Sequence, residues 1–204
     1  PMATEAITEM HALASGYCSL EIDLETGERS QRHVAVGQLL QELTGAEAAL
    51  VVNNNAGATL LTLAALASGK EVIVSRGELV EIGGSYRLPD VMATSGASLR
   101  EVGTTNKTRL PDYADAIGES TAALLKVHTS NYAIVGFTEQ TKVTDLVRLA
   151  AKHRCLVIDD IGSGALIDYS RFGLNGEPVA RASIQAGADV VLFSGDKLLG
   201  GPQC

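Results

Sequence analysis

The sequence contains no tryptophan, and aromatic residues fill only 4% of its 204 positions. A core built from this chain must therefore rely on aliphatic side chains, as the strands of parallel α/β sheets do. Hydrophobic residues make up 46% of the chain and charged residues 20%, a balance that excludes an intrinsically disordered protein. The chain is long enough for one substantial core and shows no linker, repeat or low-complexity tract, so we expect a single domain over residues 1–204.

Cysteine and long apolar runs are also scarce. The three cysteines, Cys18, Cys155 and Cys204, are odd in number and lack the spacing of a metal site, which favours a reducing cytoplasm over a secretory compartment. Cys155 opens an apolar run and is predicted to be a core thiol. No apolar stretch is long enough to span a bilayer and no signal peptide is found at the start, so we expect no membrane partner.

Positive charge is in deficit, because 16 lysines and arginines stand against 24 aspartates and glutamates and the net charge is −8. This balance argues against a broad basic surface for nucleic acid on this chain. It is compatible with a local pocket for an anion.

Short apolar runs alternate with helical patterns along most of the chain. Six runs are predicted as strands, at residues 48–52, 71–75, 98–102, 121–127, 156–158 and 188–193. Helices are predicted near the start and over residues 33–43, 56–67 and 144–153, with a polar loop at 20–31. Strands separated by helices require crossover connections, so the predicted fold is α/β, with a mostly parallel sheet and helices on both faces.

Five of the predicted strands run into unusual polar residues. These residues lie at 53–58, 76–78, 128–131, 159–164 and 194–197. In open α/β sheets, ligands bind at the carboxyl ends of the strands. The convergence of five such ends therefore predicts a ligand site at one edge of the sheet.

The segment Asn53-Asn54-Asn55-Ala56 opens a predicted helix through small residues. Free backbone N–H groups and the helix dipole at such a start attract an anion. An ordinary helix cap is the alternative, since asparagine caps well. We favour anion binding.

Asp160 ends an apolar strand and precedes a glycine-rich turn. A carboxylate there could hold a protonated heteroaromatic nitrogen, as aspartates do for the pyridinium of pyridoxal phosphate (PLP), or it could ligate a metal or cap the next turn. Asp159 is expected to point the other way. Lys197, flanked by glycines, could form a Schiff base or could simply be solvated. Ser194 could help to hold a phosphate or could form a turn.

Four further polar residues leave their alternatives open. His128 could stack on a ring, act as an acid or base, or be a satisfied interior histidine. Asn131 could contact a cofactor or cap a turn. Arg76 and Glu78 could approach the site or pair with each other at the surface.

Several longer segments resemble a known family, bacterial selenocysteine synthase, the L-seryl-tRNA(Sec) selenium transferases. The matching segments run through nearly the whole chain in order, as residues 21–29 (EIDLETGER), 43–56 (LTGAEAALVVNNNA), 70–86 (KEVIVSRGELVEIGGSY), 101–106 (EVGTTN), 126–138 (KVHTSNYAIVGFT), 160–165 (DIGSGA) and 193–203 (FSGDKLLGGPQ). The resemblance implies the large domain of a fold-type-I PLP enzyme. It also implies that this chain is a fragment of a longer enzyme, truncated at both ends.

The resemblance implies roles for individual residues. Lys197 would carry PLP through its ε-amino group and act as the base, and Asp160 would pair with the pyridine nitrogen. The remaining residues implied to bind the cofactor are Asn54, Asn55, Ala56 and Ser194 around the phosphate, and His128 and Asn131 near the ring. No metal is implied.

The implied reaction converts seryl-tRNA(Sec) to selenocysteinyl-tRNA(Sec) through an aminoacrylyl intermediate, with selenophosphate as the selenium donor. The resemblance also implies a homo-oligomer built of dimers. Two alternatives stay open. One is a related PLP-dependent ammonia-lyase that acts on an amino sugar acid, and the other is a non-catalytic scaffold that kept the fold.

Overall fold

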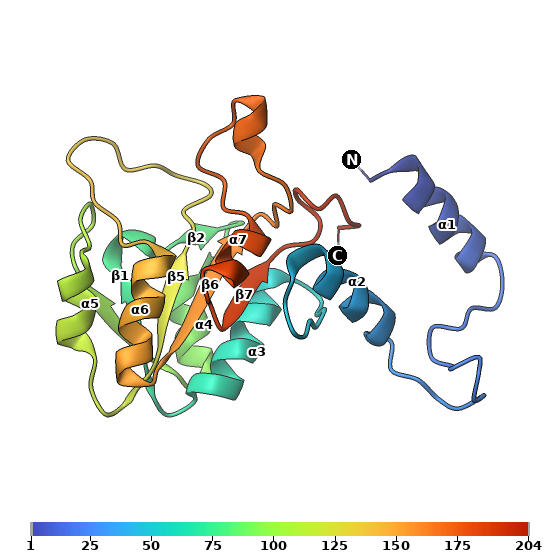
Figure 1. The fold of residues 1–204 in the computed structure, drawn as a ribbon, viewed down its shortest axis with the longest axis horizontal. Helices are drawn as coiled ribbons and strands as arrows, with labels where there is room; N and C mark the ends of the chain where they lie inside the picture. Colours follow the sequence, from blue (N-terminus) through green and yellow to red (C-terminus); the bar gives the residue numbers. More distant parts are fainter. Residues whose placement is uncertain (1, 204) are drawn as a thin grey trace.

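The computed structural model describes residues 2–203, and its centre is a five-stranded sheet in which all neighbouring strands are parallel (Figure 1). The strands lie in the order β4 (Ser98–Val102), β1 (Glu71–Ser75), β5 (Thr121–Val127), β6 (Leu156–Gly162) and β7 (Val190–Phe193). A small antiparallel hairpin, β2 (Glu81–Ile82) with β3 (Tyr86–Arg87), stands apart from this sheet. The predicted α/β fold with a mostly parallel sheet is confirmed.

Helices cover both faces of the sheet. Helices α3 (Asn55–Ala67) and α4 (Leu88–Ser95) pack on one face, and α5 (Leu110–Ala116) and α6 (Val143–His153) pack on the other. Helix α7 (Ala180–Gln185) connects β6 to β7, and two short 3-10 helices span Arg76–Glu78 and Tyr169–Phe172. Each crossover between parallel strands passes through a helix, as a parallel sheet requires.

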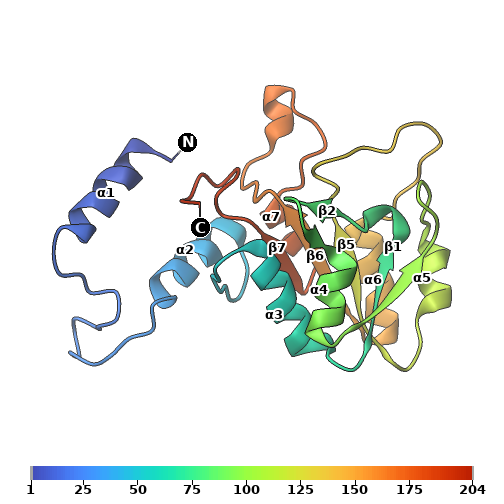
Figure 2. The same ribbon diagram turned by 180° about the vertical axis from the view of Figure 1, so that it is seen from behind.

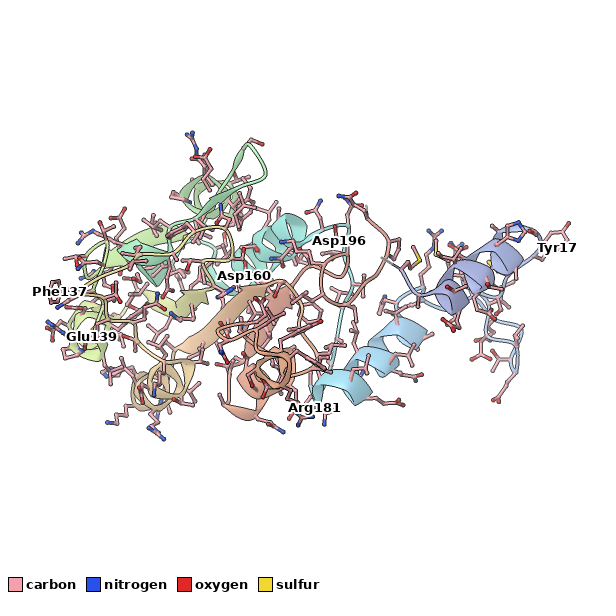
Figure 3. The ribbon with its side chains drawn as sticks, turned by 90° about the horizontal axis from the view of Figure 1, so that it is seen from above. Tyr17, Phe137, Glu139, Asp160, Arg181 and Asp196 are labelled. Atoms are coloured by element: carbon pink, nitrogen blue, oxygen red, sulfur yellow. The ribbon has the colours of Figure 1, made fainter. Side chains whose placement is uncertain are left out.

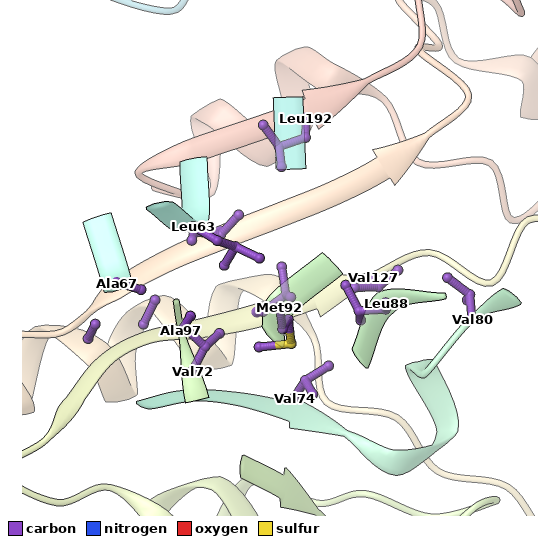
Figure 4. Packing of buried hydrophobic residues seen from close by; sticks show 14 residues of the cluster. Leu63, Ala67, Val72, Val74, Val80, Leu88, Met92, Ala97, Val127 and Leu192 are labelled. Atoms are coloured by element: carbon purple, nitrogen blue, oxygen red, sulfur yellow. The ribbon is translucent and has the colours of Figure 1, made fainter. Parts of the chain in front are cut away.

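The core is aliphatic and is split by the sheet into two layers. Because side chains alternate along a strand, Val72 and Val74 of β1 join the layer under α3 and α4, whereas Ile73 joins the layer under α5 and α6. Figure 4 shows the first layer, in which Leu63 and Met92 pack from the helices onto the strands. The predicted core thiol Cys155 lies in the second layer.

Most predicted elements match the structure closely. The predicted strands 71–75, 98–102 and 121–127 have the observed bounds of β1, β4 and β5. Strand β6 is longer than predicted and includes both aspartates, and β7 begins two residues later than predicted. The backbone pairing of Asp159 with Val191 and of Asp160 with Leu192 continues the ladder past the apolar run, which explains the longer strand.

The predicted strand at residues 48–52 is wrong. This segment has no regular secondary structure, and its Leu50 and Val51 side chains are 57% and 52% exposed. A strand needs a neighbour for its backbone N–H and C=O groups, and no described residue pairs with this segment. Apolar composition alone was therefore not enough to predict a strand at these residues.

The N-terminal residues form an arm beside the sheet domain. Helices α1 (Thr4–Ala14) and α2 (Val34–Thr44) extend away from the sheet in both views (Figures 1 and 2). Arg181 of α7 holds the end of α2 by donating to the carbonyls of Glu42 and Leu43, with its Nη2 at 2.7 Å and 3.0 Å. Helix α1 contributes no buried residue.

No helix among residues 2–203 is both long and apolar enough to cross a membrane.

Candidate functional site

The loops that follow β5, β6 and β7 meet at one edge of the sheet. The His128 N–H donates to the Asp160 carbonyl at 2.8 Å, and the Ser194 N–H donates to the Gly162 carbonyl at 2.8 Å. The Leu198 N–H donates to the Ser163 carbonyl at 3.0 Å, which ties the loop containing Lys197 to the loop after β6. The predicted convergence of strand ends is thus present for these three strands.

Asp160 lies at the centre of this edge and is only 5% exposed. Its carboxylate accepts hydrogen bonds from Asn55 Nδ2 at 2.9 Å, the Gly162 N–H at 3.1 Å and Thr59 Oγ1 at 3.3 Å. Burial raises the pKa of Asp160, while these three donors and the charge of Lys197 lower it. Figure 3 shows Asp160 within the sheet domain, with Asp196, the neighbour of Lys197, on the side toward the N-terminal arm.

The start of α3 binds to this aspartate through Asn55. Asn54 caps the helix, since its Oδ1 accepts from the Gly57 N–H at 2.8 Å, so the cap interpretation holds for that side chain. The backbone N–H groups of Asn55 and Ala56 have no acceptor among the described residues, as is normal in the first turn of a helix. The Asn55 Oδ1 atom is buried and also lacks a described partner.

Lys197 lies in the turn after β7 and its side chain is exposed. Its charge still acts on Asp160, whose pKa it lowers. Ser194 is half-buried at the end of β7. Asn131 is exposed, and its Nδ2 donates to the Glu81 carbonyl at 2.8 Å, which attaches the loop after β5 to the β2–β3 hairpin.

His128 is partly buried and has an acidic neighbour that the sequence did not indicate. Its Nε2 lies 3.9 Å from Oε2 of Glu177, and Oε1 of Glu177 accepts a hydrogen bond from the Ser163 hydroxyl. Burial lowers the pKa of His128 and outweighs the opposing effect of Glu177. Ser163 belongs to the DIGSGA segment at the end of β6, whereas Glu177 lies in an irregular loop with no periodic pattern.

A buried ion pair lies at the end of β5, between Glu78 and Lys126. Glu78 is 2% exposed, and its carboxylate pairs with Lys126 and accepts from the Val127 N–H at 3.0 Å. Of the two alternatives left open for Arg76 and Glu78, their pairing with each other is not found, because Arg76 Nε instead contacts Glu101 Oε2 at 3.0 Å. The carboxylate of Glu78 is buried because it pairs with the ammonium group of Lys126 in the interior.

Asp159 points away from Asp160, as strand alternation predicts. Asp159 is buried, and its carboxylate accepts a hydrogen bond from the side chain of Ser183 in α7. Desolvation raises its pKa to about 6, against the lowering effects of Ser183 and Lys126. Asp159 also lines a cavity of about 280 Å³ that is bounded by Lys126, His128 and α7.

The described residues hold no cluster of three or more potential metal ligands.

All 204 residues match the family model described as SelA, L-seryl-tRNA selenium transferase. The chain belongs to this family.

Two curated relatives of the selenium transferase family are highly similar to the chain. Proteins named L-seryl-tRNA(Sec) selenium transferase from Geobacter metallireducens and Alkaliphilus metalliredigens are each 59% identical, over 203 and 202 residues. These alignments cover 100% and 99% of this chain but only 44% and 43% of the relatives. The chain thus spans less than half the length of the selenium transferases that it matches.

Solved structures share the fold of this chain. The structure of D-glucosaminate-6-phosphate ammonia-lyase superposes with a TM-score of 0.75 at 22% identity, over 99% of this chain and 52% of that one. A structure titled SPT with PLP internal aldimine gives a TM-score of 0.62 at 18% identity, over 96% of this chain and 46% of that one. The fold-type-I prediction is therefore confirmed, whereas the assignment of individual cofactor-binding residues stays a prediction.

Proposed function

We propose that this chain is the PLP-holding core of an L-seryl-tRNA(Sec) selenium transferase and that Lys197 carries the cofactor. The proposed reaction converts seryl-tRNA(Sec) to selenocysteinyl-tRNA(Sec), with selenophosphate as the selenium donor. Family membership over residues 1–204 and 59% identity to the Geobacter metallireducens relative support this assignment. A cytoplasmic homo-oligomer built of dimers belongs to the same proposal.

The environment of Asp160 is the observation that carries the proposal. This carboxylate is buried and receives three hydrogen bonds, yet no cationic side chain among the described residues lies within salt-bridge distance of it. A buried carboxylate is stabilised when a cationic hydrogen-bond donor reaches it. The protonated ring nitrogen of PLP is such a donor, so the residues present fit this cofactor.

The first turn of α3 suits the phosphate of the same cofactor. Asn54 fixes the start of the helix by accepting from the Gly57 N–H. The N–H groups of Asn55 and Ala56, for which the described part of the chain supplies no acceptor, lie directly after it. Such N–H groups bind phosphate oxygens, and the helix dipole adds attraction. In this proposal Ser194, at the end of β7, supplies a hydroxyl to the same phosphate.

The remaining residues orient the ring and move a proton. PLP, when bound, supplies an electron sink for the charge that develops at the substrate Cα. The Lys197 amine would hold the cofactor covalently and, once the substrate amine had displaced it, the freed amine would take the Cα proton. In this proposal His128, whose pKa burial lowers, lies beside the ring, and Asn131 lies at the rim on the loop after β5.

Borohydride trapping tests the cofactor assignment. The protein, expressed from its complete gene, is mixed with PLP, reduced with borohydride and digested, and the pyridoxyl-modified peptide is identified by mass spectrometry. We expect the modification at Lys197 and its loss in Lys197→Ala, with no loss in Lys152→Ala, which removes an exposed lysine at the end of α6. Modification of another lysine would contradict the assignment.

Incubation with seryl-tRNA(Sec) and selenophosphate tests the substrate. Formation of selenocysteinyl-tRNA(Sec) is the expected result. Turnover of a free amino sugar acid in its place would favour the ammonia-lyase alternative, with whose solved relative this chain shares the fold at 22% identity. Absence of any reducible bond to PLP would favour the non-catalytic scaffold.

A further inference from the structure

We propose that Glu177 is a positioning residue that ties together the loops after β5, β6 and β7 and thereby holds both His128 and the loop of Lys197 in place. Glu177 lies in the irregular loop between β6 and α7, far from any strand end in the sequence. Its importance for catalysis rests on the proposed function, because that function gives Lys197 its role. The contacts of Glu177 with these loops do not depend on the proposed function.

The two carboxylate oxygens of Glu177 serve two different loops. Oε1 accepts a hydrogen bond from the hydroxyl of Ser163, which follows β6. Oε2 lies 3.9 Å from Nε2 of His128, which follows β5. Both Glu177 and His128 are largely shielded, with 27% and 25% of their side chains exposed, so their electrostatic interaction is screened less than a surface pair would be.

Ser163 extends the link to the third loop. Its carbonyl accepts from the N–H of Leu198, the residue after Lys197, at 3.0 Å. Ser163 is buried, so its hydroxyl needs a partner, and Glu177 provides it. A change at Glu177 is therefore transmitted through a single residue to the backbone beside Lys197.

The loops after β6 and β7 approach each other closely beside Ser163. Gly164, directly after Ser163, has a φ of +73°, and a Cβ there would lie 2.6 Å from the Ser194 carbonyl oxygen. The loops after β6 and β7 are thus in close backbone contact where Glu177 binds. The other charged groups that act on His128 are Lys126, which lowers its pKa, and Asp160, which raises it.

The structural link is tested in cofactor-free protein expressed from its complete gene. Hydrogen exchange at the Leu198 amide reports the loop of Lys197, and NMR titration of the His128 ring reports the charge at position 177. Glu177→Ala and Ser163→Ala should each speed exchange at Leu198 about ten-fold, the effect of losing one hydrogen bond to a charged group. The Leu125 amide in the middle of β5 serves as the internal standard, since global destabilisation would accelerate it as well.

Glu177→Gln separates charge from hydrogen bonding. The amide oxygen can still accept from Ser163, so Leu198 exchange should stay within about two-fold of wild type. The charge opposite His128 is lost, so the pKa of His128 should fall. Glu119→Gln, which removes an exposed charge before β5 at the opposite edge of the sheet, should change neither quantity.

Two results would overturn the inference: unchanged Leu198 exchange in Glu177→Ala, or an unchanged His128 titration in Glu177→Gln. The consequence for the cofactor is measured separately, as the rate of borohydride-trapped labelling at Lys197. We expect this rate to fall about ten-fold in Glu177→Ala and to recover in Glu177→Gln. If wild-type protein shows no labelling while the exchange results hold, the proposed function fails and the positioning role of Glu177 stands.

Discussion

The side-chain amide of Asn55 donates to the carboxylate of Asp160 at 2.9 Å, which joins the first turn of α3 to the end of β6. One residue thus contributes to both halves of the proposed cofactor site, through its backbone N–H at the helix start and through its side chain at the buried acid. The aspartate is held in a fixed position by contacts that originate 105 residues away in the chain.

Asn55→Ala should raise the pKa of Asp160 further, because one of the donors that lower it disappears. A hydrogen bond to a buried charged group contributes about 1.5–3 kcal/mol, and we expect a loss of that size in the free energy of unfolding at pH 8, measured by denaturant titration. Asn106→Ala removes an exposed amide that donates to a neutral carbonyl and should cost less than about 1 kcal/mol. Equal losses in both variants would contradict a special role for the Asn55–Asp160 contact.

Lys126→Met should leave the carboxylate of Glu78 buried without its cation. Breaking a buried pair in this way typically costs about 3–5 kcal/mol, and thermal unfolding at pH 8 would measure it. Burial raises the pKa of Glu78 and Lys126 lowers it, so in the variant Glu78 should take up a proton more readily, and the loss should shrink as the pH falls. Glu78→Gln combined with Lys126→Met should restore much of the stability, and a double variant as unstable as Lys126→Met alone would argue against charge as the cause.

Asp159→Asn should change how stability depends on pH. Burial raises the pKa of Asp159 from 3.8 to about 6, so the folded protein holds this proton more tightly than the unfolded chain does. The contribution of Asp159 to stability is therefore greatest below pH 3.8 and is lost as the pH rises through about 6. Asparagine does not titrate, so between pH 4 and 7 the free energy of unfolding should shift by about 2 kcal/mol in favour of the variant. Parallel stability curves for variant and wild type would contradict the raised pKa.

Gly164→Ala and Gly27→Ala form a matched pair, because both glycines have a φ of +73°. Alanine in this left-handed conformation costs about 1 kcal/mol at either position. Only at Gly164 would the new Cβ collide with the Ser194 carbonyl and the Phe193 ring, at 2.6 Å and 2.7 Å, whereas nothing lies within 4 Å of it at Gly27. Thermal unfolding should show a clearly larger loss for Gly164→Ala, accompanied by weaker PLP binding, and similar losses would indicate that the loops can separate freely.

The sequence predicted those parts of the fold that depend on local pattern. Strand β1, for example, is a short β-branched run between Gly69 and Gly77, and its predicted bounds are correct. The segment at 48–52 is also apolar, but no strand among the described residues pairs with it. Whether an apolar run becomes a strand is decided by distant residues, which local pattern does not reveal.

In the candidate site, too, local pattern predicted some features, whereas contacts between distant residues were missed. Asp160 was recognisable because it ends an apolar strand, and strand alternation correctly directed Asp159 to the other face. The pairing of Lys126 with Glu78 joins residues 48 positions apart, and Glu177 reaches His128 from an irregular loop. Such contacts are fixed by the path of the backbone between elements, so no spacing rule in the sequence could have indicated them.

Helix α1 is eleven residues long and buries none of its side chains. A helix of this length that buries no side chain against the described residues is marginal in water, because nucleation is unfavourable and few hydrogen bonds follow to compensate for it. Segments of this kind interconvert between helix and coil in about a microsecond or less. Calorimetric melting of the sheet therefore carries little signal from residues 4–14, and the helicity of this segment responds to its own surroundings more than to the integrity of the core.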